Sequence, residues 1–505
     1  MATPGFLARF FGRPPQAAPV SVPKRIARGR GARAEYDGAT HGRRSAGWRR
    51  TQLDANSELS PVVAMALRGI ARDLVRNNPF AARGVATIAN NMIGTGITFQ
   101  VYRNGVVDDR LNSVARRHFD TNQCDATGRH DLYGMQLQAA RTIVEGGGVL
   151  LRRRWRRAAD RLPLPFQLQV LETDYLDMSK DGPLPAAPGV DAGYTIHGIQ
   201  FSPIGRREGY WVYGRHPGAR RRAASTSAST FVAAENVAHV FRADRPEMEH
   251  GATWFAPVIL RMKDFADYED AELTRQKISA AFAGFVYGGE DGATSPLIGS
   301  DEPQGDFPAL DFVEPGTISH LPNGQKIEFS DPPKVDGYLE YSRVSLRAIA
   351  AGLGTPYEAL TGDLSNVNFS SGRMGWLEYQ RSLANWQWLM FIPQFCGSVG
   401  RWMIEALAMV GENVEGVEVR WTPPGREMIN PAEEVKATRD AIRSGQDTIS
   451  AAARRRGEDP DTFLAEWKAD AEKLDEMGLI FDCDPRRVTA VGNPAESDPT
   501  APRKA

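Results

Sequence analysis

Apolar residues recur every three to four positions between residues 57 and 97, which predicts two successive helices. Ser60 and Pro61 mark the start of the first, because a serine cap followed by proline suits the opening turn of a helix. Asn78 and Pro79 repeat this signal and divide the pattern in two. The further elements predicted up to residue 155 are a strand over 97–102, helices over 110–122 and 131–147, and a strand over 149–155.

The period then changes. Over residues 149–242, β-branched and aromatic residues alternate or run together between Gly and Pro turns, so this region is predicted to be mainly β. Pro257 opens a run of 27 residues that contains no Gly and no further Pro. At 1.5 Å per residue a helix over this run is roughly 40 Å long, about twice the length of an average globular helix.

The second half of the chain returns to helical periods. Residues 286–336 break into short strands and turns, with a hairpin signal at Asn323-Gly324, and residues 338–354 predict a helix. From about residue 372 to 410 the apolar residues again have helical spacing, and Pro393 is predicted to kink this helix. Residues 430–474 predict two or three short helices, so the whole pattern indicates an α+β fold.

A small polar segment stands directly in front of the aromatic helix. Asn, Ser and Gly favour loops over regular structure, so we predict a flexible loop that gives way to the helix at Trp376. The polar positions of this segment, with its single charge, are Asn366, Asn368, Ser370, Ser371, Gly372 and Arg373.

Composition fits a folded protein, with 42% hydrophobic and 24% charged residues. Net charge is -1, but charge is segregated: the first 50 residues hold eleven Lys and Arg against Glu35 and Asp37. This start is predicted to be a disordered basic arm, either a solvated tail or one that touches nucleic acid or a partner. The three cysteines are far apart, which fits a reducing compartment, and no apolar run is long enough to predict a membrane helix.

A cluster of carboxylates lies within the long predicted helix. It could hold a metal ion, as in a nuclease or another hydrolase, or it could be a solvated helix face, which is the more common role of such a cluster. No other acidic or histidine cluster completes a metal site, and no phosphate loop or nucleophile elbow occurs. We therefore predict no catalytic residue, no metal and no cofactor. The cluster consists of Asp264, Asp267, Glu269, Asp270 and Glu272.

The order of these elements resembles the phage portal proteins, and several stretches resemble their lambda-type branch. Between residues 55 and 475, six such stretches follow one another in the expected order. They are RDLVRNNPFAARGVATIANNMIGTGI (72–97), VLETDYLD (170–177), HVFRADRPEMEHGATWFAPVILRMKDFADYEDAEL (239–273), LDFVEPGTISHLPNGQKIEF (310–329), GLGTPYEALTGDLSNVNFSSGRMGWLEYQR (352–381) and NPAEEVKATRDAIRSG (430–445).

The resemblance implies a non-enzymatic ring, typically of twelve subunits, at one vertex of a viral capsid assembled in the host cytoplasm. Double-stranded DNA would pass through its channel during packaging and ejection. The implied partners are the terminase large subunit, the major capsid protein and scaffold, head-completion and tail proteins, and further copies of the chain, with no membrane. The open alternatives are the metal-dependent nuclease or hydrolase above and another structural component of a virion.

The resemblance also implies where the candidate residues lie. The acidic cluster would line or rim the channel, and the loop would point into it, with Arg373 meeting DNA or pairing with Asp363. The implied divisions are a disordered basic arm (1–55), wing (56–251), first stem helix (252–285), clip (286–336), second stem helix (337–353), tunnel loop region (354–375), long kinked wing helix with a short β patch (376–424), helical crown (425–480) and disordered tail (481–505).

Overall fold

The computed structural model divides the chain into two units, 1–53 and 54–505, and the elements described below belong to the second. Most of the predicted basic arm, nearly all of the C-terminal tail and most of the predicted clip, including Asn323-Gly324, lie outside the residues that the structure describes. The described residues are 43, 46, 47, 49, 51–184, 193–219, 228–280, 284–288, 325–329, 337–365, 367–426, 428–479 and 481.

The two predicted helix starts near the N-terminus are both present. The second, Asn78, caps the next helix by accepting hydrogen bonds from the backbone N–H groups of Phe80 and Ala81. Proline stands at the first position of both helices, where its missing N–H costs nothing. The helices of this region are α1 (Ala55–Glu58), α2 (Pro61–Asn77), α3 (Pro79–Ile93), α4 (Asp109–Phe119) and α5 (Leu132–Gly146).

The predicted β region forms two antiparallel sheets, one of three strands in the order β10-β3-β4 and one of five in the order β5-β6-β7-β8-β9. His197 (φ 46°) and Gly198 (φ 87°) make the tight turn between β6 and β7, which requires positive φ at both positions. The strands are β3 (Gly148–Trp155), β4 (Phe166–Glu172), β5 (Gly182–Pro183), β6 (Tyr194–Ile196), β7 (Ile199–Phe201), β8 (Arg207–Tyr213), β9 (Ser229–Ala233) and β10 (Val237–Phe241).

The long predicted helix is α6 (Ile259–Ala280), which packs beside α7 (Tyr338–Leu353). Their contact includes the rings of Tyr268 and Tyr341, whose centroids are 4.3 Å apart. Strand β11 (Gly284–Gly288) follows α6 and pairs with β12 (Gln325–Phe329), which precedes α7. Strand β12 thus pairs with a strand that is far from it in the sequence, and the sequence pattern did not predict this pairing.

A single continuous helix crosses this unit, and we call it the column. It consists of α9 (Phe369–Asn385), a π-helical segment (Trp386–Cys396) and α10 (Gly397–Met409). The π segment contains Pro393, which has no N–H to donate and whose ring would collide with an α-helical carbonyl. Wider turns accommodate it: the N–H of Gly397 donates to the carbonyl of Ile392, five residues back. The helix is thus irregular at Pro393, as predicted, but the irregularity is a segment of wider turns.

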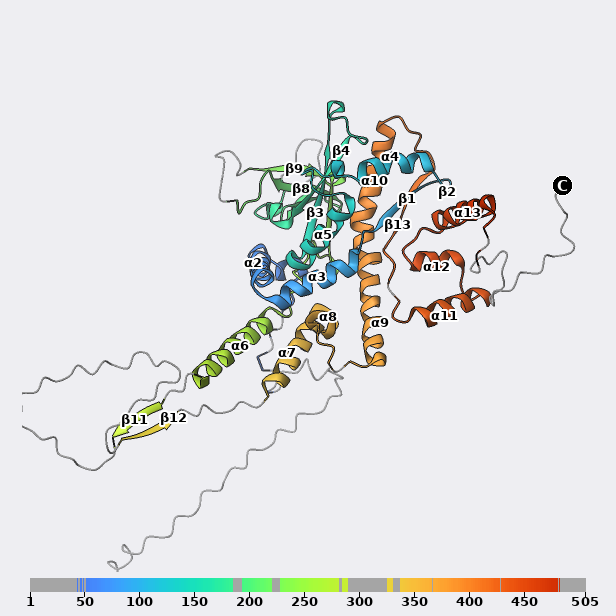
Figure 1. Ribbon diagram of the computed structural model, residues 1–505. Coiled ribbons are helices and arrows are strands. Elements are labelled where there is room, and N and C mark those ends of the chain that lie inside the picture. Colours follow the sequence, from blue (N-terminus) through green and yellow to red (C-terminus); the bar gives the residue numbers. More distant parts are fainter. Residues whose placement is uncertain are drawn as a thin grey trace, which may run out of the picture. The chain divides into compact units, whose positions relative to one another are not determined.

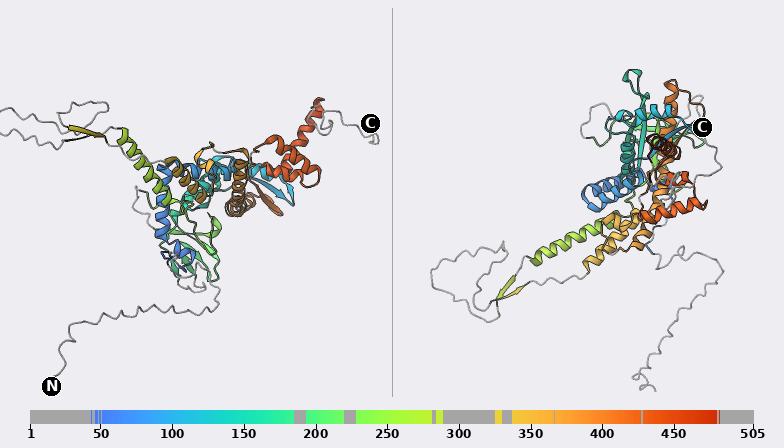
Figure 2. Two further views of the ribbon diagram at one scale, coloured as in Figure 1. Left: turned by 90° about the horizontal axis from the view of Figure 1, so that it is seen from below. Right: turned by 45° about the vertical axis from the view of Figure 1, so that its right-hand side comes forward.

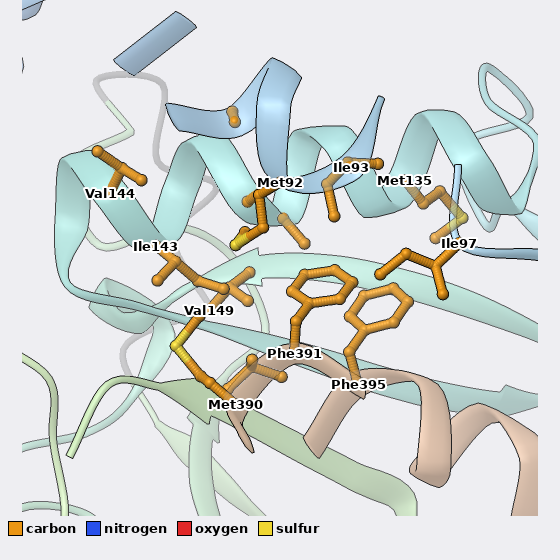
Figure 3. Close-up of a cluster of buried hydrophobic side chains, with 14 of the residues drawn as sticks. Met92, Ile93, Ile97, Met135, Ile143, Val144, Val149, Met390, Phe391 and Phe395 are labelled. Carbon is orange, nitrogen blue, oxygen red and sulfur yellow. The ribbon is translucent and has the colours of Figure 1, made fainter. Parts of the chain in front are cut away.

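The π segment also carries the centre of the hydrophobic core. Phe391 and Phe395 are fully buried and stack with ring centroids 4.8 Å apart. Figure 3 shows both rings beneath α3 and α5, close to Met92 and Ile97. Burying such aromatic rings stabilises the fold by about 1.5–3 kcal/mol each, before packing is counted. The column is therefore an integral part of this core.

Three short helices occupy the other side of the column from the two β sheets, and we call them the crown helices (Figures 1 and 2). The hydroxyl of Tyr102 bonds to carboxylate oxygens of Asp459 (2.7 Å) and Asp461 (3.1 Å) at the start of α13. Gly425 and Gly457 meet backbone to backbone, since a Cβ on Gly457 would lie 2.1 Å from the nitrogen of Gly425. The remaining elements are β1 (Thr98–Arg103), β2 (Val106–Val107), α8 (Tyr357–Thr361), β13 (Val417–Thr422), and the crown helices α11 (Pro431–Arg443), α12 (Ile449–Arg455) and α13 (Pro460–Met477).

No helix among the described residues is both long enough and apolar enough to cross a membrane.

Candidate functional site

The five acidic residues predicted on the long helix separate into two groups in the structure. Asp264, Asp267 and Asp270 lie on the exposed side of α6. The opposite side of the helix is packed, since Met262 and Phe265 are buried there. The exposed group is one helical face, as the spacing of three residues requires. One cation partly offsets it, because Lys263 lies 3.2 Å from the Asp267 carboxylate.

The other two carboxylates point toward partners of their own chain. Glu269 accepts a hydrogen bond from the Tyr338 hydroxyl of α7 at 3.4 Å, and its pKa is raised because it is partly buried. Glu272 is only 7% exposed and pairs with Arg275 one turn later, which lowers its pKa. Glu269 thus links α6 to α7, and Glu272 forms an ion pair within α6. Of the predicted cluster, only three aspartates therefore remain available to a ligand.

The predicted loop is shorter than the sequence indicated. The column begins at Phe369, so Ser370, Ser371, Gly372 and Arg373 belong to its first turns and are helical. Asn368 is the cap: its side-chain oxygen accepts the Ser371 N–H at 2.8 Å, and the Ser371 hydroxyl faces the Asn368 N–H at 3.3 Å. Asn366 lies outside the described residues.

Gly372 lies where the column meets the non-helical segment before it, which we call the connector. A Cβ at this position would approach Val367 to 2.9 Å, so glycine lets the Val367 side chain lie over the first turn of the column. Together with the Asn368 cap, this contact fixes the end of the connector at the helix. The described residues of the non-helical connector are thus 362–365, 367 and 368.

The start of the connector is held by Asp363. This carboxylate accepts hydrogen bonds from the Tyr357 hydroxyl (2.9 Å) and from the Ser365 hydroxyl (2.6 Å) and N–H (3.0 Å). Arg343 of α7 lies 3.8 Å away. The bonds from Ser365, together with the other partners, lower the pKa of Asp363 to about 2. The connector is therefore anchored to α7 at Arg343 and to the first residue of α8, Tyr357.

Arg373 is not among the partners of Asp363. Its side chain is half-buried, and within the described part of the chain it forms no ion pair. The apolar residues beside it on α9 are exposed, Met374 by 75% and Leu377 by 48%. The first turns of the column therefore offer one cation among small polar and exposed apolar side chains.

The tryptophans of the column do not all have the same surroundings. Trp386 lies 4.7 Å from Trp254 between ring centroids, and Trp376 lies 5.7 Å from Tyr379, so both pack against the core. Trp388 is 50% exposed. It lines a groove of about 1050 Å³ between the column and the crown helices.

This groove, which contains six arginines and one glutamate, was not predicted from the sequence. Its arginines come from three separate stretches, and the run Arg454-Arg455-Arg456 was the only local signal. The other arginine-rich run, 152–157, is in part structural, because Arg153 is 5% exposed and pairs with Glu405. The arginines of the groove are Arg426, Arg439, Arg443, Arg454, Arg455 and Arg456.

One group in the described residues has the arrangement of a metal site. It consists of Glu172, Asp174 and His216, whose potential ligand atoms lie within 4.8 Å of one another. Arg72 already occupies its centre, at 2.9 Å from Glu172 and 2.6 Å from Asp174, and Arg68 lies 3.5 Å from Asp174. A guanidinium there repels a second cation. The group is therefore an ion-pair network that ties α2 to β4 and the turn after it.

A second group of titratable residues consists of His197, in the β6–β7 turn, and two further buried histidines. The imidazole rings of His197 and His239 each lie 5.5 Å from that of His250, and the ring nitrogens of His239 and His250 have no hydrogen-bond partner among the described residues. Burial lowers the pKa of His250 to about 3, with Arg68 and Arg207 acting in the same direction. These cations disfavour a metal ion here as well, and burial lowers the pKa of all three histidines, which favours their neutral form.

The comparisons with known proteins agree with this absence of a catalytic constellation among the described residues. Residues 41–387 match the family model described as phage portal protein, lambda family. A probable portal protein of Halomonas phage phiHAP-1 is 24% identical over 433 residues, which cover 82% of this chain and 81% of that protein. Portal protein B of Escherichia phage lambda is 21% identical over 474 residues, covering 82% and 85%. The neck of an empty GTA particle has a chain of 16% identity and TM-score 0.46, with 80% of this chain and 100% of that chain covered.

These matches define a phage portal protein, a structural and non-enzymatic component of the virion. Since the family model covers more than half of its length, the chain belongs to the lambda family of phage portal proteins. It forms the DNA channel at the capsid vertex. The hydrolase alternative is thereby excluded, and the aspartates of α6 need no catalytic role.

Proposed function

We propose that copies of this chain form a closed ring, of twelve subunits, in which the exposed face of α6 lines the channel for double-stranded DNA. Portal proteins of this family form oligomeric rings. The observation that supports the assignment is the division of the acidic cluster: three aspartates remain exposed while the opposite side of the helix is packed. On this proposal α6 and α7 are the stem, β11 and β12 the described part of the clip, and α11–α13 the crown.

An acidic wall suits a channel through which a polyanion must slide. Two unit charges 4 Å apart interact by about 1 kcal/mol in water, and physiological salt screens them beyond about 8 Å. Repulsion of this size keeps phosphates from adhering without blocking their passage. A wall of lysines would instead bind phosphates with a steep salt dependence.

The connector and first turn of the column serve as the lip that faces the channel. Its described non-helical residues are 362–365, 367 and 368, and they are anchored at both ends by Asp363 and Asn368. Arg373, without an ion pair among the described residues, is the group of this lip that can meet a phosphate.

The ring also provides surfaces for its partners in the virion. The terminase large subunit docks at the clip end during packaging, and head-completion and tail proteins take its place afterwards. The capsid protein and scaffold surround the wing. All of these partners require a closed ring. The ring is therefore tested first, by native mass spectrometry of the purified chain.

The channel assignment is tested by neutralising the exposed face with Asp264→Asn, Asp267→Asn and Asp270→Asn. Rings of this variant should bind a fluorescent 30-bp duplex about tenfold more tightly than wild type at low salt, and this gain should vanish near 0.5 M salt, where charges are screened within about 4–5 Å. The measurement is fluorescence anisotropy across a salt series, followed by DNA retention in assembled particles.

Glu269→Gln with Glu272→Gln is the matched control. It removes two charges from the same helix, but from groups directed toward Tyr338 and Arg275. Equal gains in duplex binding by both variants would mean that the effect depends on net charge alone, and the assignment of the exposed face would be wrong.

A further inference from the structure

The groove between the column and the crown helices contains the features of a binding site for an acidic, amphipathic helix. Its arginines stand beside large apolar side chains that are unusually exposed: Trp388 by 50%, Val435 by 56% and Ile449 by 51%. Nucleic acid phosphates would satisfy the arginines but leave these apolar side chains in water. An occupant must therefore present both carboxylates and apolar groups.

The charge of the groove is not neutralised within the described part of the chain. Arg439, Arg455 and Arg456 pair with Asp440, Asp447 and Glu458. The other three arginines of the groove form no ion pair with any described residue. These are Arg426, Arg443 and Arg454, and Glu434 is the only acidic residue among those that line the groove.

The complementary surface is on the same chain. Helix α13 carries six carboxylates and two lysines, and it exposes Leu464 by 45% and Trp467 by 43%. Only Pro460 and Ala471 of this helix are buried. Two turns of a helix about 10 Å wide occupy roughly 850 Å³, which fits the groove of about 1050 Å³.

Helix α13 cannot turn its exposed face into the groove of its own chain. Tyr102 holds its first turn through Asp459 and Asp461. The backbone contact between Gly425 and Gly457 holds the preceding turn, and Arg456 lies over the Phe463 ring at 4.8 Å. Phe463 of α13 lines the groove of its own chain, while Leu464 and the carboxylates of α13 stay exposed. These exposed groups can reach the groove of another subunit, and such a contact between two different surfaces is what a ring requires.

We propose that the groove of one subunit receives α13 of its neighbour, so that crown helices interlock around the ring. This inference rests on the proposed ring and names a contact within it. Arg443 and Arg454 would face carboxylates such as Glu466 and Asp470 across the interface. Leu464 and Trp467 would cover Trp388, Val435 and Ile449.

The test is chemical cross-linking of the full-length chain. Ile442→Cys places a thiol in the groove and Leu464→Cys one on α13, in a chain that also carries Cys483→Ser. The native Cys124 and Cys396 are buried, and burial raises the pKa of both thiols, so they react little. A short bismaleimide should join the double variant into a ladder of multiples of the chain in denaturing electrophoresis.

Mixed rings distinguish contacts between chains from contacts within one. Chains with Ile442→Cys alone, assembled with chains that carry Leu464→Cys alone, should give cross-linked dimers that contain one of each. The matched control pairs Leu464→Cys with Ile204→Cys, a position that is 88% exposed in the β7–β8 turn, and should give no ladder. Arg443→Glu with Arg454→Glu should reduce the yield about fivefold. Glu466→Arg with Asp470→Arg on the partner chain should restore it.

The outcomes separate this inference from the proposed function. Intact rings by native mass spectrometry with no cross-link between chains would overturn the inference and leave the ring in place. A product within one chain would overturn it as well, and so would protection of the thiol introduced at position 442 by a 30-bp duplex and not by a second copy. A wild-type chain that forms no ring at all would refute the proposed function, and the inference with it.

Discussion

The column and the crown helices are both helical, yet they are stabilised in different ways. The column buries large side chains in its own subunit: Phe391, Phe395 and Met403 are fully buried. The crown helices bury only small ones, chiefly Ala452, Ala453 and Ala471, and leave Trp467 half-exposed. Buried apolar area is the main source of stability. The column is therefore a product of the subunit's own fold, whereas the crown depends on a few tethers and, by our inference, on a neighbouring subunit.

The largest effect is expected from removing a ring of the column core. Phe391→Ala should lower the free energy of unfolding by about 3–5 kcal/mol, because it deletes a buried aromatic side chain and leaves a cavity. Thermal unfolding followed by circular dichroism measures the change. Trp388→Ala, one turn earlier on the same helix but half-exposed, should cost less than half as much. Equal losses would contradict the contrast between core and groove.

A smaller loss of stability is expected at low pH. It should arise from the buried histidines of the β region. The pKa of His250 is about 3 in the folded protein, against an ordinary value of 6.5, and the pKa of His239 is also lowered by burial. Between these values the unfolded chain binds more protons, so the free energy of unfolding falls as pH drops below about 6.5. The loss is about 1.4 kcal/mol per pH unit for each histidine.

Melting temperatures at pH 7.5 and 5.0 measure this loss. His250→Gln should reduce the difference between the two temperatures, since glutamine does not titrate. His130→Gln, at an exposed position, should leave the difference as it is. If both variants keep the wild-type difference, the buried histidines do not cause the acid sensitivity.

The smallest effect concerns the tether of the crown. Tyr102→Phe removes one hydroxyl that bonds to Asp459 and Asp461, which should cost about 1 kcal/mol locally. Limited proteolysis should then cleave between residues 423 and 460 sooner than in wild type, while the overall melting temperature stays within about one degree. A change in the melting temperature as large as that of Phe391→Ala would show that crown and column unfold together.

Much of the fold was predictable because its signals are local. Ser60-Pro61, Asn78-Pro79 and the Gly-free run after Pro257 each give a helix start or length from neighbouring residues. The start of the column was placed too late, although Asn368 and Ser371 already form a capping pair in the sequence. Small polar residues favour loops, but here the helix cap outweighs that preference.

The candidate site was predictable only in part, because its geometry depends on distant contacts. The spacing of Asp264, Asp267 and Asp270 placed them on one face, but only the packing of Tyr338 shows that Glu269 is turned away from it. The arginines of the groove come from the crown and from the segment before it, and no local pattern brings them together with Trp388. The pairing of β11 with β12 is likewise a long-range event.

The widened segment at Pro393 changes the direction in which the apolar stripe of the column faces. An α-helix turns by about 100° per residue, whereas the wider turns of Trp386–Cys396 use more residues per turn and shift the phase of everything that follows. The apolar stripe therefore meets α3 before this segment and β13 after it. The apolar faces of α9 and α10 therefore point in different directions around one helix axis. Loss of one residue within the wide turns would rotate all of α10 against the sheet it supports.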